Sequence, residues 1–265
     1  MLFPESERVL YKKNPLVEVI CQLRFPTILR IREGHLADFQ DMIRKDYPGY
    51  SEQEPSFRVP PQTPKELATV IEQMNIPMPP GSISHRFSTK DSKRFISLRD
   101  GSMSLAETKY ERWESFKREI VKAENALKRV YEPALYSRVG LRYRDIISRR
   151  SLGLTEVGWN GLLKPYIIAE LGDKDISDAI LRIQTRVIIK IPDIPNGQVM
   201  INHGLITPNG SDEECYLIDA DFSVDRKEGI DEPFEILDEF NRMAGRLFRW
   251  AISERLHKAM EPRAI

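Results

Sequence analysis

The order of the predicted elements repeats along the chain, and this repeat constrains the fold more than any other feature. Residues 16–131 read as a strand, a helix, three strands and a long helix, and residues 137–250 read in the same order with little residue identity. Two such halves can build one sheet that packs on helices. We therefore predict a single domain over residues 1–265, made of half-repeats at about 14–131 and 136–258.

The first half opens with a strand over residues 16–25, in which apolar and polar side chains alternate. A helix is expected over 35–46, and a weak strand at 83–87 precedes a hairpin. The hairpin joins 94–98 to 103–107 through Asp100-Gly101, because both residues tolerate a positive φ. Helix 112–131 carries one apolar stripe, which predicts packing on the sheet.

The second half matches the first element by element. Asp231 is the expected N-cap of its long helix, and Ser253 is the expected cap of a short final helix over 254–260. Its predicted elements are strand 137–147, helix 162–171, strands 180–191, 198–207 and 215–224, and helix 233–250.

Residues 47–82 interrupt the pattern of the first half. They hold eight of the eighteen prolines of the chain, with one or two helical turns expected around Lys65–Met74. Such a composition predicts a long surface insertion. The alternative is a functional lid or docking segment.

The predicted fold class is α+β. Two βαβββα pseudo-repeats would form a curved antiparallel sheet on two long helices, as in TATA-binding-protein-like or helix-grip folds. The alternative is a tandem of ferredoxin-like modules, because residues 16–147 also read βαββαβ when the weak strand is left out. Either likeness concerns the fold and carries no function.

The side of the sheet away from the helices is predicted to be a broad charged surface. One interpretation is a solvated face with ion pairs across the strands. The other is a recognition surface for a carboxylate, a phosphate or an acidic protein segment, since the guanidinium group suits planar anions. The candidate binding residues are Arg24, Arg138, Arg142, Arg144, Arg182, Gln184, Arg186, Lys190, Asp219 and Asp221.

Signals for catalysis are weak. The four histidines lie in different elements without a metal-binding motif, and His203 is expected to be a hydrogen-bonded structural residue. Asp219 and Asp221 could hold Mg²⁺ with a phosphate substrate, which is the basis of an alternative function as a metal-dependent nucleotide- or nucleic-acid-binding protein or enzyme. We predict no catalytic residues, no metal ligands and no cofactor.

Composition narrows the location and the partners. Forty basic and forty acidic residues cancel, which disfavours non-specific nucleic-acid binding. The strand aromatics fall on the apolar side, so a base-stacking platform is not indicated. Cys21 and Cys215 predict neither a disulfide framework nor a zinc site. With no signal peptide or membrane span expected, a cytoplasmic protein is predicted.

The segment Asn14-Pro15-Leu16-Val17-Glu18-Val19-Ile20-Cys21-Gln22-Leu23-Arg24-Phe25 resembles the start of a sporadically distributed family of uncharacterised bacterial proteins. The resemblance extends to Val139–Tyr143 and Phe248–Glu254, and implies no known activity. Sporadic distribution suggests defence or CRISPR-accessory loci. The leading hypothesis is a non-enzymatic protein-binding or regulatory module of a bacterial multi-component system, which presents its charged sheet face to a protein partner. Whether an open strand edge also pairs with a second copy to form a homodimer is left open.

Overall fold

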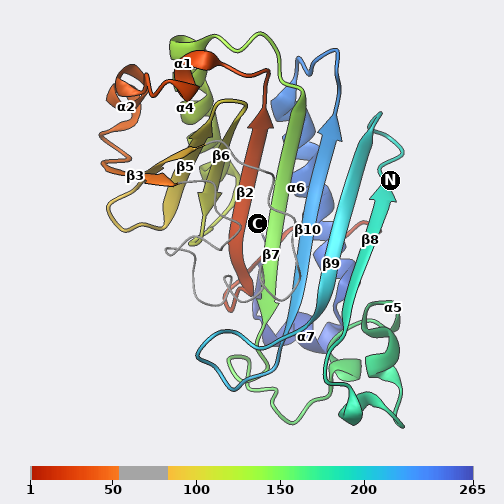
Figure 1. Ribbon diagram of the computed structural model, residues 1–265. Coiled ribbons are helices and arrows are strands. Elements are labelled where there is room, and N and C mark those ends of the chain that lie inside the picture. The colour runs from red at the N-terminus through yellow and green to blue at the C-terminus, as the bar shows by residue number, and fades with distance from the viewer. Residues whose placement is uncertain (1, 54–82, 265) are drawn as a thin grey trace.

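The computed structural model describes residues 2–53 and 83–264. Nine strands form one open antiparallel sheet in the order β3-β4-β5-β6-β2-β7-β10-β9-β8 (Figure 1). The strands are β2 (Leu16–Arg24), β3 (Gly49–Gln53), β4 (Ser84–Ser88), β5 (Arg94–Arg99), β6 (Ser102–Glu107), β7 (Arg138–Ile147), β8 (Gln184–Lys190), β9 (Gly197–Ile206) and β10 (Cys215–Asp225).

The two halves of the chain meet at β2 and β7, which pair near the middle of the sheet. Cys21 lies opposite Leu141, and the register shifts between Leu16 and Glu18. Outward from this pair the order is β6, β5, β4, β3 on one side and β10, β9, β8 on the other. The order β5-β6-β2-β7 is the one expected for a βαββαβ module, and β10, β9 and β8 continue the same sheet beyond β7.

Two long helices cover one face of the sheet. Helix α4 (Trp113–Tyr131) contacts β6, and α6 (Pro233–Ala251) runs behind β7 and β10 (Figure 1). Both helices bury an apolar stripe that includes Phe116 and Phe240. The stripe meets the side chains of alternate strand residues, because a pleated strand sends successive side chains to opposite faces. The amphipathic pattern of both helices thus predicted their packing correctly.

The predicted hairpin is present with a different turn geometry. Arg99 pairs with Ser102, so Asp100 and Gly101 form a two-residue loop. Neither loop residue has a positive φ. Arg32, at the end of the short helix α1 (Leu29–Arg32), instead donates to Asp100 Oδ2 at 2.9 and 2.6 Å and ties the loop to the first half.

Several predicted boundaries were wrong. Residues 49–53, expected to begin the surface insertion, form the edge strand β3. The helix expected over 35–46 is shorter, α2 (Ala37–Ile43), and β8 begins at Gln184 rather than at 180. Residues 54–82, which include the helical turns expected around Lys65–Met74, lie outside the described residues.

The helix expected over 162–171 is broken into short pieces. Pro165 begins a single turn, α5 (Pro165–Ile168), and Ala169 follows with a φ of +44°, which a continuous helix does not allow. Three 3₁₀ turns surround α5: η1 (Trp159–Gly161), η2 (Ala169–Gly172) and η3 (Ser177–Ala179).

The two predicted helix caps had different outcomes. Glu232, not Asp231, occupies the N-cap of α6, and its side chain makes no capping bond. Ser253 caps α7 (Glu254–Ala259) as predicted, since its Oγ accepts from the Leu256 N–H at 3.2 Å. This bond satisfies one of the free N–H groups at the start of α7.

A second, two-stranded sheet brings the ends of the chain together. Strand β1 (Val9–Tyr11) pairs with β11 (Pro262–Ala264). Phe3, before β1, contacts Trp250 of α6, and Tyr11 of β1 contacts Phe248 of α6, at ring-centre distances of 5.4 and 5.8 Å. No helix in the described parts of the chain is long and apolar enough to cross a membrane.

Candidate functional site

Six of the ten candidate binding residues lie close together on β2, β7 and β10. The register places Arg142 opposite Asp221 and Arg144 opposite Asp219, on the face away from α4 and α6. The six are Arg24, Arg138, Arg142, Arg144, Asp219 and Asp221. The predicted shared face is therefore present on the three central strands.

These central charges bind one another. Arg142 donates two hydrogen bonds to the Asp219 carboxylate, at 2.6 and 2.5 Å. Arg144 pairs with Glu18 at 2.6 Å, and Arg138 lies 3.4 Å from Asp221. The arrangement matches the interpretation in which charges on neighbouring strands pair with each other.

The central cluster is not the exposed surface that the strand pattern predicted. Asp219 is fully buried, and Glu18 and Arg144 are also buried. Burial favours a higher pKa for the Asp219 carboxyl, but Arg142 and Arg144 overcome this effect and hold its pKa below the usual range. Burial raises the pKa of Asp221 in spite of Arg138 and Arg142. The cluster therefore contributes structural ion pairs, whose breakage leaves a buried charge.

The geometry gives no support to a metal site at Asp219 and Asp221. Both carboxylates face arginines, which occupy the positions that a metal would need. Within residues 2–53 and 83–264, no cluster of three or more histidine, cysteine, aspartate or glutamate side chains is arranged to hold a metal ion.

The buried histidine His203 and the two cysteines have surroundings that suit a structural role. His203 is buried, and its Nδ1 lies 2.9 Å from the Tyr216 hydroxyl, as expected for a hydrogen-bonded structural residue. Burial lowers the pKa of His203. Cys21 and Cys215 are buried free thiols whose pKa values burial raises, so neither resembles an activated nucleophile.

The other four candidates lie at or beside β8, the last strand of the sheet. Arg186 donates to Asn202 Oδ1 at 2.7 Å. Arg182 and Lys190 are exposed and form no ion pair with any described residue. Gln184, at the start of β8, is also exposed. The candidate residues thus divide into a buried central cluster and an exposed edge.

The edge is also apolar. The exposed fractions of Val187 and Ile188 are 40% and 60%, and Leu181 is fully exposed. Ile188 shares its face of β8 with Arg186 and Lys190, because these residues alternate along the strand. One strand therefore presents a cation, an apolar side chain and a second cation in a row.

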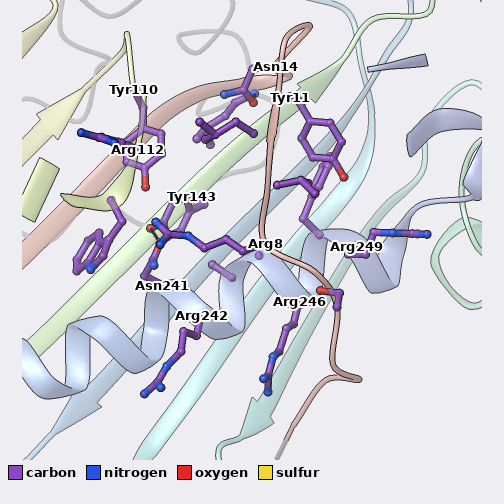
Figure 2. A pocket seen from close by; sticks show the side chains of 18 of the residues that line it. Arg8, Tyr11, Asn14, Tyr110, Arg112, Tyr143, Asn241, Arg242, Arg246 and Arg249 are labelled. Atoms are coloured by element: carbon purple, nitrogen blue, oxygen red, sulfur yellow. Dashed lines mark hydrogen bonds between the residues drawn. The ribbon is translucent and has the colours of Figure 1, made fainter. Parts of the chain in front are cut away.

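A cavity of about 430 Å³ lies on the opposite side of the sheet, where α6, β7 and the segment before β2 meet (Figure 2). Its wall includes Asp145 of β7, Asn241 of α6 and the aromatic side chains of Tyr110 and Tyr143. Tyr143 donates to Asn241 Oδ1 at 2.9 Å. Figure 2 shows the Arg8 side chain extending toward Tyr110 and Tyr143.

The sequence predictions did not include this cavity, although one signal for it was present. Val139, Leu141, Tyr143 and Ile147 are the apolar side of β7, and Asp145 falls on that same side. A carboxylate among residues that face helices is unusual, because ionised groups are rarely buried without a partner. The opposite wall could not be foreseen, since it comes from residues 6–14, more than a hundred positions earlier.

Comparison with known proteins finds no matching family model and no matching curated protein.

Proposed function

We propose that this protein is a non-enzymatic protein-binding module of a multi-component bacterial system, such as an antiviral defence or CRISPR-accessory system. The observation that carries the proposal is the edge strand β8. It pairs only with β9 in the described part of the chain, and Val187 and Ile188 are exposed on it.

An edge strand of this kind is a binding template. Backbone N–H and C=O groups along the outer side of residues 185–190 point away from β9, and an extended segment of another protein could add to them as a further strand. Soluble proteins usually shorten or cover apolar edges to prevent unwanted pairing. An edge that keeps Val187 and Ile188 exposed therefore favours a dedicated partner.

The charges on β8 define the partner's chemistry. Arg186 and Lys190 flank Ile188, and Arg182 precedes the strand without an acidic partner among the described residues. A strand laid beside β8 would place its side chains opposite these residues, where unlike charges are favourable. We infer an extended partner segment in which every second residue, on the face shared with Arg186, Ile188 and Lys190, is in turn acidic, apolar and acidic. Nucleic acid is the less favoured partner, because Tyr143 and Phe222 lie in the core rather than on the exposed face.

In this proposal the central cluster supports the edge without binding the partner. The ion pairs of Arg142 and Arg144 hold β2, β7 and β10 in register, and β9 and β8 extend from that rigid centre. We also propose that the sheet and its two helices represent a TATA-binding-protein-like or helix-grip arrangement of two pseudo-repeats. The strand order outward from β2 and β7 supports this assignment.

The test is affinity purification of the full-length tagged protein from its native host after nuclease treatment. We expect a stoichiometric protein partner whose recovery falls at least about tenfold with Ile188→Asp, and equally with Arg186→Glu combined with Lys190→Glu, because each change opposes strand addition by an acidic and apolar segment. Leu29→Asp, at a residue 59% exposed on α1, is the matched control and should leave recovery unchanged.

Two outcomes would overturn the proposal. Equal recovery with the β8 variants and the control would place the contact elsewhere, and the absence of any stoichiometric partner would show that the protein is not a binding module of this kind. Light scattering measures the oligomeric state of the purified protein. If the wild type is a dimer and Ile188→Asp is a monomer, the partner bound at β8 is a second copy of this chain. Melting temperatures of all variants verify that each is folded.

A further inference from the structure

Asp145 is a buried carboxyl group without a partner in the described residues. It is 9% exposed and lines the cavity beside α6, and its carboxyl group forms neither a hydrogen bond nor an ion pair with any residue in ranges 2–53 and 83–264. Burial, and to a lesser extent the charge of Asp219, raises its pKa to about 8. The Asp145 oxygens are not among the fully enclosed side-chain atoms without a partner, so they open into the cavity, where a group from outside the chain can pair with them.

The groups around Asp145 suit a flat, polar ring. Tyr110 and Tyr143 stand edge to face with ring centres 6.1 Å apart, and Trp113 and Phe248 also line the cavity. Asn241 uses its Oδ1 to accept from Tyr143, which leaves its amide N–H groups for a ligand acceptor. Aromatic walls with a few placed polar groups are typical of small-molecule sites.

The rim of the cavity supplies positive charge. Arg8 and Arg112 lie at the Tyr110 end, and Arg112 has no ion-pair partner among the described residues. Arg8 lies 2.7 Å from Glu114, but both side chains are about half exposed, so the pair is weak and can be exchanged. The acidic side chains of Glu7 and Glu111 also line the cavity, alongside five arginines in all. An anionic group is therefore favoured at the rim.

The size of the cavity separates the candidate ligands. A volume of about 430 Å³ lies within the range of roughly 300–1,000 Å³ usual for ligand sites, and an inorganic anion would leave most of it unfilled. Ionised Asp145 has two oxygens that accept two parallel N–H bonds, so at neutral pH the carboxyl group releases its proton to solvent as such a base binds. Guanine presents two neighbouring N–H donors on its pairing edge, whereas adenine presents only its amino group there.

We propose that this cavity binds a nucleotide whose base carries two neighbouring N–H donors, of which guanine is the natural example. The base edge would donate to Asp145, the ring would lie among the aromatic side chains, and the phosphate would face Arg8 and Arg112. This site is independent of the β8 edge, because β10 and β9 separate β7 from β8.

Calorimetric titration of the full-length protein tests the ligand without any mutation. The probes are guanosine monophosphate, inosine monophosphate, adenosine monophosphate, guanosine and inorganic phosphate. We expect guanosine monophosphate to bind at least about tenfold more tightly than inosine monophosphate, which lacks the second N–H donor, and than guanosine, which lacks the phosphate. Adenosine monophosphate and phosphate alone should bind more weakly still.

Variants then assign the contacts. Asp145→Asn should weaken guanosine monophosphate binding at least about tenfold, whereas Asp175→Asn, at an exposed loop residue, should not change it. Arg112→Gln should weaken the phosphate-bearing ligand and leave guanosine unchanged, with the exposed Arg129→Gln as its control.

The proposal fails if no guanine nucleotide binds at millimolar concentration, or if Asp145→Asn binds as tightly as the wild type. Equal affinity for the guanosine and inosine monophosphates would overturn the role of the paired N–H donors. Equal affinity for guanosine and guanosine monophosphate would overturn the role of the arginines. The comparison of guanosine and inosine monophosphates uses only wild-type protein, so it tests the role of the paired N–H donors even if a variant does not fold.

Discussion

Arg142 and Asp219 are joined across β7 and β10 by two hydrogen bonds of 2.6 and 2.5 Å, although 77 residues separate them in the chain. Asp219 is fully buried, and Arg144 Nε lies 3.6 Å from the same carboxylate. Two guanidinium groups thus share one buried carboxylate. Such a group depends on all of its members, because the loss of one partner leaves a charge in a poorly solvated position.

Removing the arginine should therefore destabilise the fold strongly. We expect Arg142→Met to lower the free energy of unfolding by about 3–5 kcal/mol, since Asp219 would remain buried without its two-bond partner. Urea denaturation measures the change. The double variant Arg142→Met/Asp219→Leu should recover most of the loss, because it removes both charges. A loss below about 1 kcal/mol in the single variant would show that the pair contributes no more than an exposed ion pair.

Asp145 should make stability depend on pH. Its pKa in the folded protein is about 8, well above the value of 3.8 expected in the unfolded chain, so the folded state holds a proton that the unfolded state has lost. The contribution of Asp145 to stability is complete below about pH 4 and is lost as the pH rises toward about 8.

Asp145→Asn should remove this loss, because the amide does not ionise. Relative to the wild type, the variant should gain stability between about pH 4 and pH 8, by at most about 1.4 kcal/mol per pH unit. Urea denaturation of both proteins at a series of pH values measures the difference. Parallel pH profiles would show that Asp145 ionises normally in the folded protein.

Gly204 should control the attachment of β8. Its φ is +153°, and a Cβ atom there would lie 2.0 Å from the Ile183 carbonyl oxygen, which accepts a hydrogen bond from Leu205 at 3.1 Å. Gly204→Ala should push residue 183 away, break this bond and lower stability by at least about 2 kcal/mol. Gly210→Ala is the control, because its φ is also positive, at +77°, but no atom lies within 4 Å. Equal losses in thermal unfolding would attribute the effect to φ alone rather than to contact with β8.

The elements predicted well have a local signature. The alternation in β2, β7 and β10 and the apolar stripes of α4 and α6 each follow from side-chain direction over a few neighbouring residues. Weaker segments were predicted less well. Strand β3 has only five residues and begins at Gly49, within Tyr47-Pro48-Gly49, which has the composition of a turn. Pairing with β4 decides its conformation.

The candidate binding residues were likewise predicted well in their local features and less well in their tertiary contacts. Strand parity placed Arg142, Arg144, Asp219 and Asp221 on one face correctly, but could not show that they pair with one another and become buried. Their partners come from strands adjacent only in the folded sheet. The contacts of Arg144 with Glu18, 126 positions earlier, depend on β2 and β7 meeting at the centre.

By itself, the sequence determined the α+β class, the long helices, most strands and the side of each strand that is apolar, because these depend on short-range periodicity. The tertiary structure alone decided the strand order, the pairing of the central charges, the exposure of β8 and the cavity at Asp145. These features depend on contacts between segments that are distant in the sequence. A local pattern is compatible with many sets of such contacts, and core packing together with the pairing of buried polar groups selects one of them.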